Sequence, residues 1–126
     1  MPFIHVRSLP FEPELDVAPI LAGLTRDLVD TSGVDSNHVT VTWDYFAPGH
    51  YSVGGDAPTV QPASTHPVIA ELFVPDFYAV ETLEAMLRCV GASIAARAPV
   101  DVGNVFVSYR AALSGQVYED GDLVRW

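Results

Sequence analysis

Pro2, directly behind Met1, is the residue whose type and position best suit catalysis in this sequence. Removal of Met1, the usual outcome when the second residue is small or proline, would leave a secondary amine at the start of the chain. Such an amine ordinarily has a pKa of roughly 7.7 to 8.0, and burial lowers that pKa because it disfavours the charged form. The position therefore indicates a base that is neutral near physiological pH. The simpler interpretation is that proline only begins a strand, where its missing N–H costs nothing.

Other residues with catalytic potential form no recognisable motif. Asp44 and Glu71 lie in otherwise apolar segments, where burial would raise their pKa and suit them to donate protons; the alternative is that each pairs with an arginine. No histidine spacing is typical of a metal site, and the sequence has neither a complete phosphate loop nor a nucleophile elbow. We therefore expect no metal and no cofactor.

The charge balance bears on the partners of the protein. Six basic residues, all of them arginine, stand against sixteen acidic ones, and the net charge is −10. Such a surface repels nucleic acid and anionic lipid, so we predict neither as a partner. Each arginine could bind a carboxylate, with a structural ion pair as the alternative. No apolar segment approaches the ~18 residues of a membrane span and no secretion signal is evident, so a soluble, cytoplasmic protein is expected.

The elements that must position Pro2 follow from hydrophobic periodicity. Apolar residues alternate or run continuously in four segments that predict strands, and the segment after Pro67 is apolar enough to predict burial on both faces. Two segments with helical spacing follow Asp16 and Asp76, which we expect to cap them. The predicted strands are 3–9, 38–46, 67–74 and 105–109, and a hairpin is expected over 117–124 around Asp120-Gly121.

The two halves of the chain match in outline. Pro2-x-Ile4 recurs as Pro67-x-Ile69, and each half reads strand, helix, strand, over residues 2–46 and 67–110. Right-handed β-α-β units place both helices on one face of a four-stranded mixed sheet. We predict a single α+β domain over residues 1–126, with a hairpin at about 116–126. The chain has nothing left to cover the other sheet face, which predicts self-association.

With Pro2 at the head of the first strand, this pair of β-α-β repeats resembles the tautomerase superfamily, which includes proteins similar to macrophage migration inhibitory factor and to cis-3-chloroacrylic acid dehalogenase. The similarity covers nearly the whole chain. The loop Tyr51-Ser52-Val53-Gly54-Gly55-Asp56 resembles the double-glycine loop of those proteins, and Gln116-Val117-Tyr118-Glu119-Asp120-Gly121 resembles the dehalogenase tail.

The resemblance implies a homotrimer and a set of site residues. It implies that Pro2 is catalytic and that Glu119 falls on the glutamate that activates water in the dehalogenases. Phe106 and Ser108 fall on the strand positions that reach a neighbouring subunit's pocket. Tyr118, beside Glu119, is either a proton donor near the pocket or an aromatic residue at a subunit interface.

The sequence also departs from the family. Residues 73–77 contain none of the arginines that hold the substrate carboxylate in the dehalogenases, and Val34 and Phe106 replace a lysine and a tyrosine of the cytokine-like members. We therefore expect any substrate carboxylate to be bound by Arg7 or Arg110, and we favour Arg7 because it shares a strand with Pro2.

Three functions remain open from the sequence. The first is a cofactor-independent tautomerase in which Pro2 is the general base for isomerisation of a small keto or enol acid. The second is a trimeric binding or interaction protein that keeps the scaffold without chemistry, as the missing arginines suggest. The third is a hydratase or decarboxylase in which Pro2 acts as an acid and Glu119 orients water.

Overall fold

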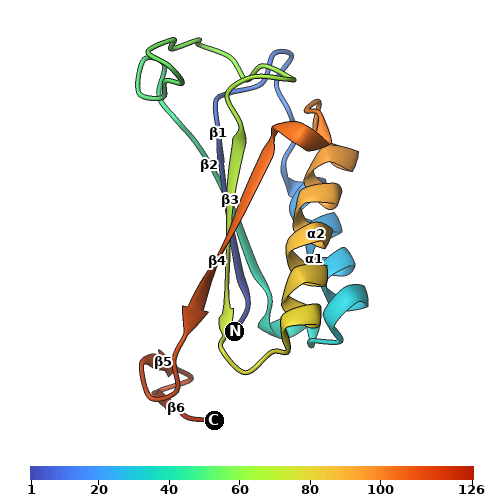
Figure 1. The fold of residues 1–126 in the computed structure, drawn as a ribbon, viewed down its shortest axis with the longest axis vertical. Helices are drawn as coiled ribbons and strands as arrows, with labels where there is room; N and C mark the ends of the chain where they lie inside the picture. Colours follow the sequence, from blue (N-terminus) through green and yellow to red (C-terminus); the bar gives the residue numbers. More distant parts are fainter.

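Alternating apolar residues build the sheet that the sequence predicts. The computed structural model describes residues 1–126, and in it β1 and β3 lie antiparallel at the centre, with β2 parallel to β1 and β4 parallel to β3 at the edges (Figure 1). The order β2-β1-β3-β4 confirms the mixed four-stranded sheet made of two β-α-β units. The strands are β1 Phe3–Ser8, β2 Thr40–Tyr45, β3 Val68–Pro75 and β4 Val105–Ala112.

Two helices cover one face of this sheet, as the right-handed crossovers require (Figure 1). They are α1 Ala18–Ser32 and α2 Val80–Arg97. Gly33 ends α1 with a left-handed φ of 74°, a conformation that glycine adopts readily. The core lies between the helices and the sheet, and its largest fully buried side chains include Ile4, Leu24, Leu28, Leu72, Met86 and Ile94.

The predicted helix caps are wrong. The residue before α1 is Val17, without a capping side chain, and Asp16 makes only a long contact of 3.4 Å with the Ala18 N–H. The residue before α2 is Ala79, three positions after Asp76. The Asp76 carboxylate instead accepts a hydrogen bond of 2.8 Å from the Trp126 indole N–H. Asp76 therefore binds a residue far away in the sequence and does not cap the helix that follows it.

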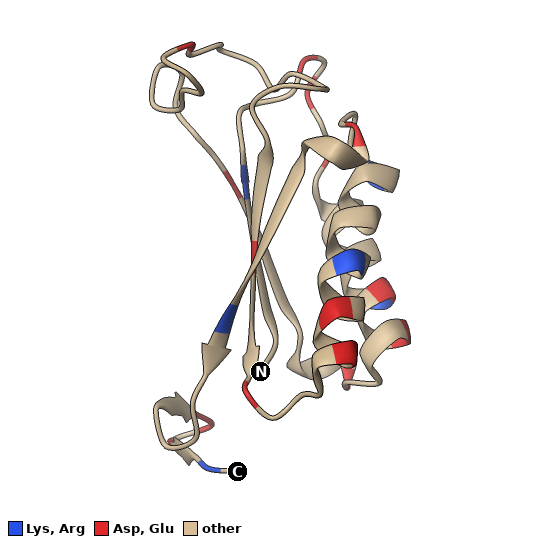
Figure 2. Ribbon diagram, viewed as in Figure 1, with Lys and Arg blue, Asp and Glu red and all other residues tan.

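The sheet face away from the helices is uncovered in the single chain. Side chains of β3 alternate between buried and half-buried, so within one chain the strand is not buried on both faces. Figure 2 shows arginines and acidic residues on the strands as well as on the helices. His5 and Asp44 approach to 2.7 Å there, and the Arg110 guanidinium lies 2.9 Å from Glu71 and stacks over Phe73.

The remaining segments lie at the two ends of the sheet. The predicted hairpin is present as β5 Val117–Glu119 and β6 Asp122–Val124, with positive φ at Asp120 and Gly121, and it extends beyond the end of β4 (Figure 1). Residues 47–66 form a loop at the opposite end. Short 3-10 turns, Ser36–His38 and Val102–Asn104, precede β2 and β4. Neither helix has the length and apolarity needed to cross a membrane.

Candidate active site

Pro2 lies in a cavity of about 290 Å³ at the end of the sheet from which the hairpin extends. Four separate parts of the chain form it: the start of β1, the turn before β2, the connection from β3 to α2, and the hairpin with the two residues after it. The lining residues are Met1, Pro2, Val34, Asp35, His38, Pro75, Phe77, Tyr78, Glu119, Val124, Arg125 and Trp126.

The backbone fixes Pro2 at the floor of this cavity. Proline has no N–H to leave unpaired at the head of a strand, and the Pro2 carbonyl accepts a hydrogen bond of 2.9 Å from the Thr40 N–H. Pro2 is buried, whereas Met1 is half-buried. Removal of Met1 would therefore enlarge the cavity and transfer the terminal amine to a more buried residue.

The electrostatics of the cavity act on that amine in two directions. Burial lowers the pKa of the Met1 amine from its ordinary value, while the negative charges of Glu119 and then Asp120 oppose the shift, and burial prevails. An amine with a lowered pKa is neutral over a wider range of pH, which is the form that accepts a proton.

The hairpin places Glu119 in the lining of the Pro2 cavity and directs Tyr118 away from it. Glu119 is half-buried and lines the cavity, while Tyr118 is 72% exposed and does not line it. Successive side chains of a strand point to opposite sides, so only one of the two can face the cavity. Within one chain, the predicted pair Pro2 and Glu119 shares a site and Tyr118 lies outside it.

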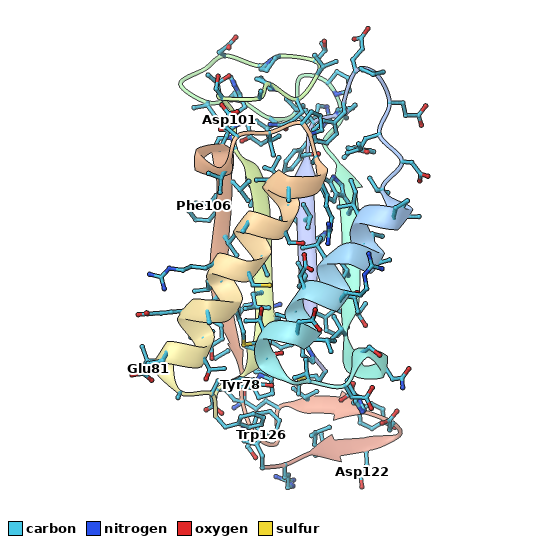
Figure 3. All side chains as sticks on the ribbon, turned by 90° about the vertical axis from the view of Figure 1, so that its right-hand side faces the viewer. Tyr78, Glu81, Asp101, Phe106, Asp122 and Trp126 are labelled. Carbon is cyan, nitrogen blue, oxygen red and sulfur yellow. The ribbon has the colours of Figure 1, made fainter.

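Aromatic rings form one wall of the cavity. Phe77 lies 4.7 Å from Tyr78 and 5.8 Å from Trp126 between ring centroids. Burial raises the pKa of the Tyr78 hydroxyl above its ordinary value, so this group stays protonated at neutral pH. Trp126 is held by Asp76 and by a backbone hydrogen bond of 2.9 Å to the Ser114 hydroxyl, and Figure 3 shows it beside Tyr78.

Arg125 is the arginine that lines the Pro2 cavity, and sequence reasoning did not single it out. Its guanidinium lies against Gly115, where an added Cβ would be 2.7 Å from Nη1, and Gly115 has a φ of 78°. The left-handed backbone conformation therefore favours glycine there, and an added Cβ would displace the end of the Arg125 side chain. The only sequence signal for Arg125 was its place directly after the predicted hairpin.

The other predicted residues lie elsewhere in the chain. Arg7 and Ser108 line a small hollow on the open sheet face. Arg7 is five positions after Pro2 along an extended strand, which corresponds to about 17 Å. Phe106 is 56% exposed near the start of β4, at the other end of the sheet from Tyr78 and Trp126 (Figure 3). Arg110 is engaged by Glu71. No group of histidines, cysteines and carboxylates is arranged to hold a metal ion.

Comparison with known proteins identifies the fold. No family model and no curated protein matches the sequence. Among solved structures, a wild-type fused 4-OT, an asymmetric trimer, matches with a TM-score of 0.81 at 18% identity, over 96% of this chain and 94% of its own. A member of the cis-3-chloroacrylic acid dehalogenase family matches with a TM-score of 0.78 at 15% identity, over 97% and 82%.

A third structure extends the range of activities found on this fold. Malonate semialdehyde decarboxylase, which has decarboxylase and hydratase activities, matches with a TM-score of 0.68 at 13% identity, over 92% of this chain and 88% of its own. These matches show that the chain has the tautomerase-superfamily fold over nearly its whole length. At such identities they show the fold alone, so the chemistry has to be argued from the cavity.

Proposed function

We propose that this chain, which has the tautomerase-superfamily fold, is a cofactor-independent isomerase of small keto or enol acids with Pro2 as its general base. The observation that carries the proposal is the burial of Pro2 at the floor of a cavity that also holds a carboxylate and an arginine. Loss of Met1 would make the Pro2 nitrogen a basic secondary amine at that floor.

The proposed reaction is a proton transfer between oxygen and carbon. The neutral Pro2 amine takes the proton from the enol hydroxyl, and the O–H electron pair forms the C=O double bond. The π electrons of the C=C bond move to the carbon α to the new carbonyl, and the protonated amine gives its proton to that carbon. Glu119 stabilises the protonated amine between the two steps because its charge is negative. Positioned proton transfer of this kind contributes typically about 10² to 10⁴ in rate.

We propose that the protein is a homotrimer whose open sheet faces meet. The matched fused 4-OT is a trimer, and the open face of this chain carries exposed Phe3 and Phe106 and half-buried Ile69. Phe106 and Ser108 cannot reach Pro2 of their own chain, so their proposed role as substrate-binding residues requires a neighbouring subunit's cavity. Arg7 and Tyr118 would also take part only through such an arrangement.

Glu119 supports a second function on the same site. Its charge opposes the lowering of the pKa of the Met1 amine by burial, and the same charge beside a terminal Pro2 would favour the protonated amine. In a hydratase or decarboxylase, a protonated Pro2 would act as the acid and Glu119 would orient water. A third alternative, a binding protein without chemistry, is supported by the absence of arginines from residues 73–77.

The test compares the mature protein with Pro2→Ala in the ketonisation of phenylenolpyruvate. Mass spectrometry first establishes whether Met1 has been removed. We expect Pro2→Ala to lower kcat/KM at least about 100-fold, because alanine supplies a primary amine without the proline ring. Pro48→Ala, in the exposed part of the loop after β2, is the matched control and should retain full activity. Equal rates for wild type and Pro2→Ala would refute the role of Pro2.

A further inference from the structure

Arg125 is the cation of the Pro2 cavity, and it has no partner in the structure. No hydrogen bond or ion pair engages its guanidinium, and its side chain is exposed to solvent. Three other arginines are already paired with carboxylates: Arg88 with Glu84 at 3.7 Å, Arg97 with Asp27 at 3.0 Å and Arg110 with Glu71 at 2.9 Å. Arg125 is therefore available to bind a ligand carboxylate through two parallel hydrogen bonds.

The aromatic wall beside Arg125 is left open to solvent. Phe77 is 57% exposed and Trp126 is 39% exposed, although their rings pack edge to face against each other. Asp76 and Ser114 hold Trp126 in place, so the apolar surface is preformed. A ring or a bulky apolar group on the ligand would bury this surface, and aromatic pairs add to the free energy gained from the buried area itself.

Apart from the terminal amine, the charged groups that line the cavity with Arg125 are carboxylates. Asp35 and Glu119 line it together with Arg125, which gives two carboxylates and one guanidinium. Asp120 lies close enough to act on the terminal amine as well. One negative charge on a ligand would be matched by Arg125, but a second would face these carboxylates, and like charges in a partly buried site repel.

We infer that the Pro2 cavity is selective for monocarboxylic acids that carry an aromatic or bulky apolar group, with Arg125 binding the carboxylate and Phe77 and Trp126 contacting the apolar group. Dicarboxylic acids are rejected by Asp35 and Glu119. This inference rests on the proposed function, since it assigns the substrate class of the same cavity. It differs from the sequence expectation, in which Arg7 or Arg110 binds the carboxylate.

The test measures binding separately from turnover. Calorimetric titration of the mature protein with 3-phenylpropanoate, which has no enol to isomerise, is compared with titration by phenylsuccinate, which has the same phenyl ring and a second carboxylate on the side-chain carbon attached to it. We expect phenylsuccinate to bind at least about tenfold more weakly. Arg125→Gln should weaken 3-phenylpropanoate binding about 10- to 100-fold, the range for loss of hydrogen bonds to a charged group.

Two control variants make the result specific. Arg88→Gln removes an exposed arginine from α2 and should leave binding unchanged. Phe77→Ala should weaken 3-phenylpropanoate but have little effect on butanoate, which has no ring. Unchanged 3-phenylpropanoate binding in Arg125→Gln, tighter binding of the diacid, or no binding of either acid would overturn the inference.

The same titrations separate this inference from the proposed isomerase. If Pro2→Ala binds 3-phenylpropanoate as the wild type does but neither protein ketonises phenylenolpyruvate, the ligand class stands and the proposed reaction fails. If the wild type isomerises dicarboxylic enols in preference to phenylenolpyruvate, the proposed reaction stands and the ligand class is wrong.

Discussion

Glu119 is the residue whose charge most directly affects the proposed base. It opposes the lowering of the pKa of the Met1 amine by burial, and we expect the same effect on the Pro2 amine once Met1 is removed. We therefore predict that Glu119→Gln lowers the pKa of the amine further. Because the base works in its neutral form, which predominates above its pKa, the acid limb of the kcat/KM profile for ketonisation should move to lower pH.

The control for this measurement is Asp122→Asn, on the same hairpin but outside the cavity lining. It should leave the position of the acid limb nearly unchanged. A shift of the limb to higher pH in Glu119→Gln would contradict the electrostatic role that we assign to Glu119. Loss of turnover without any shift would instead support the alternative in which Glu119 orients water.

The sequence identified part of the candidate site and missed part of it for a physical reason. Pro2 could be named from its place in the chain, and Glu119 from the resemblance of residues 116–121 to the dehalogenase tail. Arg125 could not be placed, because its position depends on the packing of Trp126 against Phe77 and Asp76, which are about fifty positions earlier in the sequence. Local periodicity contains no information about such contacts.

At the scale of elements, the contact between α1 and α2 depends on a close approach at Gly23. A Cβ added to Gly23 would overlap with the Arg97 side chain, whose guanidinium bonds to Asp27 at 3.0 Å. Ser93 donates to the same carboxylate at 2.7 Å. Because Gly23 has no side chain, the Arg97 side chain of α2 can pass over it and reach Asp27 on α1.

We predict opposite effects for the same substitution in the two helices. Gly23→Ala displaces Arg97, and the loss of its hydrogen bonds outweighs the gain in helix propensity, so the free energy of unfolding falls by about 1 kcal/mol. At Gly91 the nearest atom to an added Cβ is Val107 Cγ2 at 3.8 Å, an ordinary contact. Gly91→Ala should therefore raise the free energy of unfolding by about 0.5 to 1 kcal/mol.

Urea unfolding followed by circular dichroism measures both variants under the same conditions. Similar gains in stability for Gly23→Ala and Gly91→Ala would show that Arg97 moves aside at no cost.

The existence and order of the helices and strands could be predicted, because periodicity is a property of each segment. The caps could not, since Asp76 has a partner outside its own segment.

At the scale of the whole molecule, the open sheet face is the surface through which we propose that three chains associate. Phe106 lies on this face and is 56% exposed. Phe106→Asp would place an unpaired charge in each interface, at a cost of about 3 kcal/mol or more. We expect this variant to be monomeric, or much more weakly associated, in analytical ultracentrifugation.

Val80→Asp provides the comparison for this experiment. Val80 is 65% exposed at the first turn of α2, where a negative charge is favourable. This variant should keep the oligomeric state of the wild type. A trimeric Phe106→Asp protein would place the interface elsewhere, and a monomeric wild type would remove the proposed assembly altogether.

The presence of both Pro2 and Trp126 in one cavity has a practical consequence for recombinant expression. A purification tag added before Met1 would acylate the nitrogen that has to be free, and a tag added after Trp126 would begin at the aromatic wall. Either fusion protein would be assayed with its own tag next to the substrate. The exposed loop around residues 57–60 lies at the other end of the sheet, so an internal affinity tag inserted there would leave the cavity unchanged.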